Sequence, residues 1–181
     1  MKINILLCIV LSVALSVPTD AQFQRPGYGP EQTKLAFLAG TYTTLVHIPA
    51  GPAAPNGADG KGTLNVQWGL DSLFLIIDDQ SMNELLGNYK GHGLLGFDRH
   101  DAKYVLSMFN NFGDTPQYRG SFSGDTLILT TKVEFSKGSF DQKLVWYKDH
   151  GILRLKVYND IGKGSMLTME EISTPTADVK K

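Results

Sequence analysis

Apolar and polar side chains alternate with a period of two through most of this chain after Gly40. In Ile152–Tyr158, for example, Leu153, Leu155 and Val157 fall on one face, and charged residues separate them. This spacing is typical of a β-strand with one buried face and one face in water. The pattern therefore favours a sheet with one face exposed to solvent.

Turn residues divide this pattern into short segments, about 8–12 residues apart, as in β-sandwiches and barrels. The predicted strands are Thr41–Ile48, Gly62–Trp68, Leu73–Ile77, Asn88–Asp98, Tyr104–Phe109, Tyr118–Phe122, Leu127–Phe135, Phe140–Tyr147, Ile152–Tyr158 and Met166–Ile172. We predict an all-β domain, a closed antiparallel up-and-down barrel of about ten strands, because closure removes unpaired sheet edges. A short N-terminal helix is predicted over Glu31–Leu38. Apart from a candidate helical turn at Ser81–Leu86, nothing later has helical periodicity, which excludes a βαβ fold.

One segment, Pro49–Lys61, breaks the strand pattern with three prolines and several glycines. We expect a long loop there. A loop of this length is either a mobile lid or a tolerated insertion.

The N-terminus has the features of an export signal. Lys2 precedes the apolar run Ile5–Val17, whose 13 residues fall short of the ~20 that a membrane-spanning helix needs. Pro18 and the small residue Ala21 follow, which fits cleavage after Ala21. We predict a cleaved signal peptide at residues 1–21 and a periplasmic or secreted protein. A buried N-terminal helix is the alternative interpretation.

The remaining chain divides into a flexible leader at 22–30, a single β-barrel domain at 31–172 and a flexible tail at 173–181. Cleavage would remove Cys8, the only cysteine, so the domain would fold without a disulfide. The net charge is −1 and no basic run occurs, so the sequence indicates no nucleic-acid partner. It also contains no integral membrane span.

Two segments carry a family resemblance. Lys34–Tyr42 resembles the opening of calycin-like, or lipocalin-like, barrels, in which a short helix leads into a Gly-Thr-Trp-type first strand. Tyr89–Asp98, followed by Lys103-Tyr104 and Asn110-Asn111, resembles the central motif of the bacterial family known as domain of unknown function 1579. Gly120 and Leu127–Thr130 fit the next hairpin of that family. The resemblance implies the barrel fold and no established activity.

The chain departs from the family pattern at four positions. Tyr42 stands where the family usually has Trp, and Phe97 replaces the usual Tyr. Met108 and Asn110 stand where Trp and Asp are common. A chemical role for that Asp in relatives would therefore not carry over to this chain.

The histidines give no metal motif. His47, His92, His100 and His150 lack the spacing of metal ligands. The related nitrobindin barrels bind haem through a histidine near their C-terminal strands, and Ile152–Ile172 contains none. We therefore predict no metal and no cofactor.

Two groupings of polar residues bear on catalysis. His92 with Tyr89, Tyr104 or Asp98 could form a general-base site inside the barrel; the alternative is a strand histidine satisfied by a neighbour or by water. Asp78-Asp79 and Glu170-Glu171 are adjacent pairs whose members point to opposite faces of a strand, so neither pair is an acid/base dyad.

Aromatic side chains give the candidate ligand site, which we place at Trp68, Tyr89, His92, Tyr104 and Trp146, with Phe140 as a further wall. If these rings leave space between them they line an apolar pocket, and if they interdigitate they are core. Three functions stay open: a protein that binds a small apolar ligand in its barrel, an isomerase or hydrolase that uses the barrel interior, and an envelope interaction module with a packed core.

Overall fold

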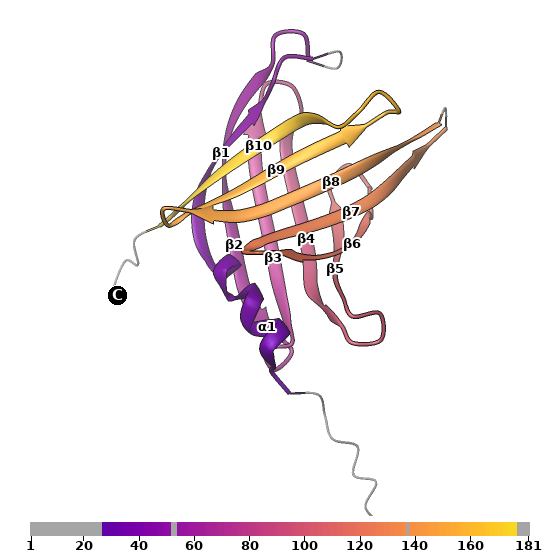
Figure 1. The fold of residues 1–181 in the computed structure, drawn as a ribbon. Coiled ribbons are helices and arrows are strands. Elements are labelled where there is room, and N and C mark those ends of the chain that lie inside the picture. Colours follow the sequence, from indigo (N-terminus) through magenta and orange to yellow (C-terminus); the bar gives the residue numbers. More distant parts are fainter. Residues whose placement is uncertain (1–26, 52–53, 137, 177–181) are drawn as a thin grey trace, which may run out of the picture.

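Ten strands form where the period-two pattern predicts them. The computed structural model describes residues 27–51, 54–136 and 138–176, and it closes these strands into one antiparallel barrel (Figure 1). The strands are β1 (Gly40–Ile48), β2 (Ala58–Gly69), β3 (Phe74–Asn83), β4 (Gly87–Asp98), β5 (Lys103–Asn110), β6 (Gln117–Ser123), β7 (Thr126–Phe135), β8 (Gly138–Asp149), β9 (Ile152–Asp160) and β10 (Met166–Pro175). The predicted fold class is confirmed.

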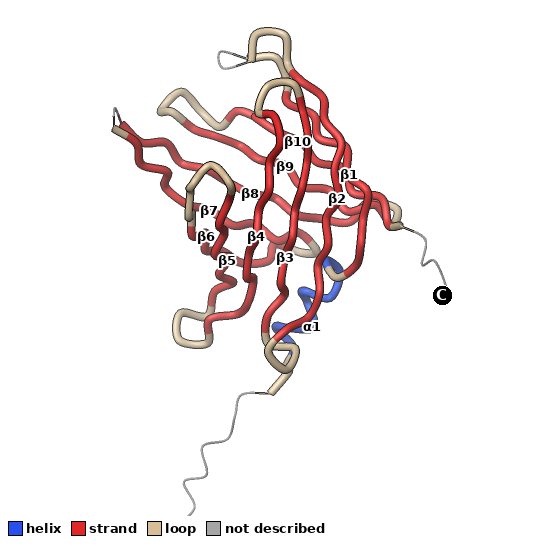
Figure 2. The backbone as a smooth tube through the Cα atoms, turned by 180° about the vertical axis from the view of Figure 1, so that it is seen from behind, coloured by secondary structure: helices blue, strands red, loops and turns tan. Residues whose placement is uncertain are grey.

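The topology is up-and-down. Each strand pairs with its sequence neighbours, and β1 also pairs with β10, so Val46 of β1 lies opposite Gly60 of β2 on one side and Glu171 of β10 on the other. The connecting loops gather at the two ends of the barrel (Figure 2). Pairing of the first strand with the last satisfies backbone groups that an open sheet would leave exposed.

The short helix α1 (Pro30–Leu35) continues as a 3₁₀ turn (Ala36–Leu38) and covers one end of the barrel (Figure 1). Pro30 suits the first helical turn, and the side chain of Gln32 accepts a hydrogen bond from Gly29 N–H at 3.1 Å. Leu35 and Leu38 are buried, at 0% and 2% exposure. The predicted helix is confirmed, and its apolar side seals the barrel.

The apolar core lies beneath this helix. Leu75, Leu95 and Leu127 project inward there and are fully buried. Leu153 and Val157 are buried on the interior face of β9, as the alternation predicts. One end of the barrel is thus filled with side chains.

The loop predicted at Pro49–Lys61 is too long, because β2 begins at Ala58. Its glycines suggested irregular backbone, but Gly60 is paired on both sides, with Val46 of β1 and Asn83 of β3. A Cβ atom at Gly60 would stand 2.7 Å from the carbonyl oxygen of Met82. The glycine therefore permits close strand packing and does not mark a loop.

Two further boundaries differ from the prediction. The helical turn expected at Ser81–Leu86 is wrong, because β3 continues to Asn83. The Asn83 side chain accepts hydrogen bonds from the N–H groups of Leu85 and Leu86, at 3.1 and 2.7 Å, and so forms a tight turn. The last strand was predicted to end at Ile172 and runs on to Pro175, with Ser173 buried. The predicted signal peptide lies outside the described residues.

Candidate functional site

The barrel interior is open at the end away from α1, where it forms a cavity of about 870 Å³ that we call the barrel cavity. Its apolar wall consists of Val46, Ile48, Leu64, Ile77, Leu106, Met108, Phe140, Leu144, Trp146, Leu155, Val157 and Met169. Its mouth is bordered by Leu85, Leu86 and Phe112, which are about half exposed. A cavity of this size matches the usual volume of small-molecule sites.

Two of the predicted ligand residues, Tyr89 and Trp146, line the barrel cavity. Trp146 is 6% exposed and stands on the interior face of β8. Burial, together with the nearby negative charge of Asp79, raises the pKa of Tyr89. Phe140, predicted as a further wall, also lines the cavity.

Trp68 and Tyr104 lie elsewhere. Both face inward but near the covered end, where they belong to the core. Trp68 packs edge-on against Tyr28, with 5.5 Å between ring centroids. Tyr104 packs against Phe122 at 5.0 Å, and its hydroxyl donates to the backbone oxygen and carboxylate of Glu31, at 3.1 and 2.5 Å. The two-residue alternation predicts which face of the sheet a side chain takes, but not its position along the barrel axis. Trp68 and Tyr104 were therefore wrongly predicted to line the ligand site.

His92 is on the outer surface. Residues 89, 91, 93 and 95 of β4 face the interior, so His92 faces water. Its Nδ1 lies 2.7 Å from Asp78 Oδ1, and its side chain is 55% exposed.

The general-base site proposed around His92 is therefore not formed. Tyr104 lies under α1, and Asp98 lies at the start of the turn after β4. Hydrogen bonds, chiefly from the His100 N–H at 2.9 Å, lower the pKa of Asp98. The three side chains share no space in which a substrate could meet them.

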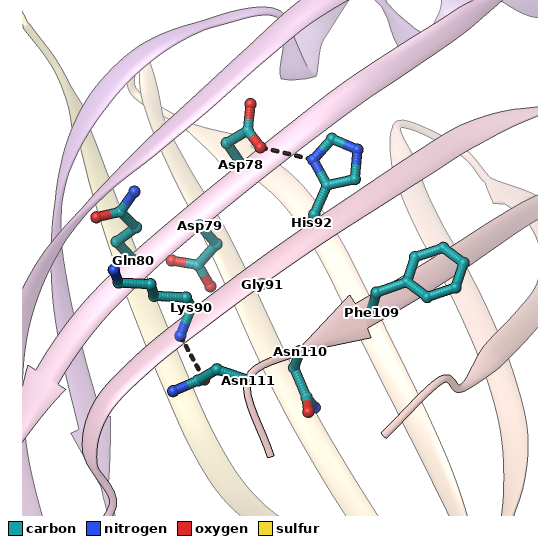
Figure 3. Close-up of a pocket in the computed structure, with 9 residues that line it drawn as sticks. All are labelled: Asp78, Asp79, Gln80, Lys90, Gly91, His92, Phe109, Asn110 and Asn111. Atoms are coloured by element: carbon teal, nitrogen blue, oxygen red, sulfur yellow. Dashed lines mark hydrogen bonds and ion pairs between the residues drawn. The ribbon is translucent and has the colours of Figure 1, made fainter. Parts of the chain in front are cut away.

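His92 and Asp78 instead border a shallow outer depression of about 310 Å³ (Figure 3). Its floor includes Lys90, whose backbone N–H donates to Asn111 Oδ1 at 2.8 Å. Figure 3 shows Asp78 directed toward His92 and Asp79 directed away from it. Asp79 and Asn110 border both this depression and the barrel cavity.

The sequence analysis missed two carboxyl groups inside the barrel, Asp79 and Glu171, which we call the interior carboxyl pair. Both line the barrel cavity. Burial raises the pKa of Asp79 to about 6. Burial and the charge of Asp79 raise the pKa of Glu171 to about 8. Glu171 is 3% exposed, and its Oε1 accepts a hydrogen bond from Ser173 Oγ at 2.8 Å.

The adjacent acidic residues do point to opposite faces, as predicted. The sequence analysis did not recognise that the inward members of these pairs, Asp79 and Glu171, line the same barrel cavity. The signal was present in the alternation, since Ile77 and Asp79 share a face of β3, as do Glu171 and Ser173 of β10.

Further polar groups surround this pair. Tyr118 donates its hydroxyl to Gln142 Oε1 at 2.5 Å, and burial raises the Tyr118 pKa to about 12. Thr44 Oγ1 and Asp79 Oδ1 are buried and have no hydrogen-bond partner in the part of the chain that the structure describes. A few polar groups in a mainly apolar cavity are typical of a small-molecule site.

Within the described residues, no three His, Cys, Asp or Glu side chains gather as metal ligands. No helix among them is long and apolar enough to cross a membrane.

Comparison with known proteins agrees with this architecture. The family model described as "Protein of unknown function (DUF1579)" matches residues 28–156. The crystal structure of Rv2717c from M. tuberculosis is similar with a TM-score of 0.60 at 14% identity, over 82% of this chain and 99% of that one. A de novo designed fluorescence-activating β-barrel aligns over 77% of this chain and 94% of its own, at 12% identity and a TM-score of 0.41. No curated protein matches.

Proposed function

This chain belongs to the DUF1579 family, whose description assigns no activity, and from the geometry of its own barrel we propose that it binds a small, largely apolar molecule in the barrel cavity. The observation that carries the proposal is the open half of the interior. A cavity of about 870 Å³ remains there, although the other half is filled with side chains. Such a volume accommodates one small ligand.

The lining supports a mainly apolar ligand. Aliphatic and aromatic residues supply most of the wall, and Trp146 and Tyr89 add flat ring surfaces. Leu85, Leu86 and Phe112 border the mouth, where exposed apolar side chains would lower the cost of transferring such a molecule from water. The open interior also counts against an interaction module with a packed core.

The first test is the binding of Nile red, an uncharged dye that fluoresces in apolar surroundings. We expect saturable 1:1 binding that Leu144→Trp weakens by about ten-fold or more, because Leu144 faces the cavity. Val145→Trp is the matched control, since Val145 adjoins Leu144 on the opposite face of β8. Thr131→Trp, nearer the mouth, replaces Leu144→Trp if that variant does not fold.

Either of two results would overturn the proposal. One is that the native protein shows no saturable binding of Nile red. The other is that the inward Trp variants bind Nile red as tightly as Val145→Trp does. Mass spectrometry of native protein purified from its own cells would then search for the natural ligand.

We also propose that the protein acts after export. The support is the basic start and the apolar run Ile5–Val17, followed by small residues at the expected cleavage point. We expect the protein recovered from the periplasm or the medium to begin at Gln22, as measured by its intact mass. Full-length protein retained in the cytosol would contradict this.

A further inference from the structure

Among the described residues the interior carboxyl pair has no cationic partner, whereas the outward neighbours of its members have basic side chains beside them. Asp78 lies 2.7 Å from His92. Glu170 lies 3.4 Å from Arg154 and 3.8 Å from Lys156. No salt bridge among the described residues involves Asp79 or Glu171. The exposed carboxylates thus have basic partners and the buried ones have none, and an ionised buried carboxylate without a partner costs free energy.

The remaining charges of the barrel cavity do not compensate. Its lining contains four carboxyl side chains, Asp79, Asp114, Glu134 and Glu171, and a single cation, Lys132, among the described residues. Lys132 lies near the end of β7, at the rim. The deep part of the cavity therefore presents acceptors and negative charge.

The surroundings of the pair contain buried polar atoms without partners. Asp79 Oδ1 has no hydrogen-bond partner among the described residues, and neither has Thr44 Oγ1, although Thr44 is only 2% exposed. Thr44 lies on the interior face of β1, opposite Ser173, the residue that bonds Glu171. Buried polar atoms are normally satisfied, so these two point to a missing hydrogen-bonding group.

Glycines keep space free beside these atoms. Gly62 of β2 lies opposite Thr44, and a Cβ atom there would stand 2.8 Å from Thr44 Oγ1. Gly91 of β4 lies opposite Asp79, and the Tyr89 hydroxyl lies over it, 2.6 Å from where a Cβ would stand. Two glycines and one phenol thus form part of the interior wall around the pair.

We propose that the ligand of the barrel cavity carries a protonated amine, and that Asp79 and Glu171 bind this ammonium group while the apolar wall holds the rest of the molecule. The inference rests on the proposed ligand-binding function and adds the chemical class of the ligand. An ammonium group brings three N–H donors and one positive charge. It would offset one negative charge of the pair and give Asp79 Oδ1 a partner.

Binding of the ammonium group is coupled to the release of a proton. With raised pKa values, the pair retains a proton near neutral pH when the barrel is empty. Besides the two carboxyl groups, the titratable groups here are Tyr89 of β4, whose pKa the charges of both members raise, and Tyr118 and Asp114, which also raise it. Strands β1 and β9 place Val46 and Leu155 beside Glu171. None of these supplies a positive charge, so an arriving ammonium lowers both pKa values and releases a proton.

The test compares tryptamine, a cation at neutral pH, with tryptophol, which replaces its amine by a hydroxyl. Both are titrated calorimetrically into the native protein. We expect tryptamine to bind about ten-fold more tightly or better. We also expect its binding heat to differ between buffers of different ionisation enthalpy, as proton release requires.

The variant Asp79→Asn/Glu171→Gln keeps the shapes and removes both charges. We expect it to lose the preference for tryptamine and to bind tryptophol as before. Asp78→Asn/Glu170→Gln, the outward counterpart, should keep the preference. If the inner double variant does not fold, Asp79→Asn alone should reduce the preference and the proton release.

The outcomes separate the two proposals. Equal affinity for tryptamine and tryptophol in the native protein overturns the amine inference and leaves the ligand-binding function standing. A preference that survives in the inner variant overturns the role of Asp79 and Glu171. Binding of neither compound, together with no saturable Nile red signal, overturns the ligand-binding function itself.

Discussion

Asp78 and Asp79 are identical side chains in adjacent positions, yet they sit in opposite electrostatic surroundings. Asp78 faces water and lies 2.7 Å from His92, while Asp79 faces the barrel cavity with a buried, unpartnered oxygen. Glu170 and Glu171 repeat this contrast on β10. At the scale of the residue, the face of the strand decides whether a carboxyl group is exposed to water or is buried with a raised pKa.

This contrast predicts an unusual pH dependence of stability. The pKa of Glu171 is raised from 4.5 to about 8 by burial, so the folded state binds its proton more tightly than the unfolded state does. Its stabilising contribution is complete below about pH 4.5 and is lost as the pH rises through 8. We expect the free energy of unfolding, measured in urea, to fall over this range by on the order of a few kcal/mol.

Glu171→Gln cannot lose a proton, so its unfolding free energy should vary much less over the same range. Glu170→Gln is the matched control and should keep the slope of the native protein. Parallel curves for the native protein and Glu171→Gln would contradict the assignment.

Tyr104 offers a second prediction at this scale. Its hydroxyl anchors α1 through Glu31 and lowers the pKa of that carboxyl. Tyr104→Phe should reduce the free energy of unfolding by about 1–2 kcal/mol, and Nile red affinity should stay the same because Tyr104 lies outside the barrel cavity. Tyr89→Phe changes the cavity wall and is the variant expected to alter dye affinity instead. Loss of dye binding in Tyr104→Phe would show that the two ends are not independent.

At the scale of the element, α1 closes one end of the barrel. A six-residue helix is too short to be stable alone in water. Its stability comes from Leu35 and Leu38, which pack on the barrel core, and from the bonds between Glu31 and Tyr104. The strands in turn gain a covered end, where Leu35 and Leu38 complete the core.

We therefore expect Leu35→Ala to destabilise the protein by about 2–5 kcal/mol, since it removes a fully buried side chain and leaves a cavity. Urea unfolding followed by circular dichroism measures this loss. Lys34→Ala, on the exposed side of the same helix, should change stability by no more than about 0.5 kcal/mol. Similar losses in both variants would contradict the assignment of the stability of α1 to the packing of Leu35.

At the scale of the whole molecule, the barrel has one packed half and one open half. Leu95 of β4 and Leu106 of β5 lie opposite each other, and both are fully buried. Toward the mouth, the strands end in turns with exposed apolar residues such as Leu85 and Phe135. Few buried contacts mean a low free energy of local opening.

Hydrogen exchange should reproduce this gradient. Amides around Leu95 and Leu106 should exchange only through global unfolding, and those of the hairpin that joins β7 to β8 should exchange much faster. Mass spectrometry of peptic fragments measures both. If tryptamine or Nile red occupies the barrel cavity, protection should rise near the mouth. Uniform protection along all strands would contradict the two-half description.

The sequence by itself determined the barrel and the face that each strand residue takes. Ile77 and Asp79 on one side of β3, and Asp78 on the other, follow from the two-residue repeat of an extended chain, which is a local property. Strand ends were less certain where glycine served close packing, as at Gly60, because the same residue also suits a loop.

Only the tertiary structure decided the height of each side chain in the barrel and its neighbours across the interior. It placed Trp68 and Tyr104 under the helix, and Tyr89 and Trp146 at the barrel cavity. It also placed Asp79 of β3 in the same cavity as Glu171 of β10, which lies far from it along the chain. Height depends on the register between strands, and register is set by long-range pairing around a closed sheet. No local pattern carries that information.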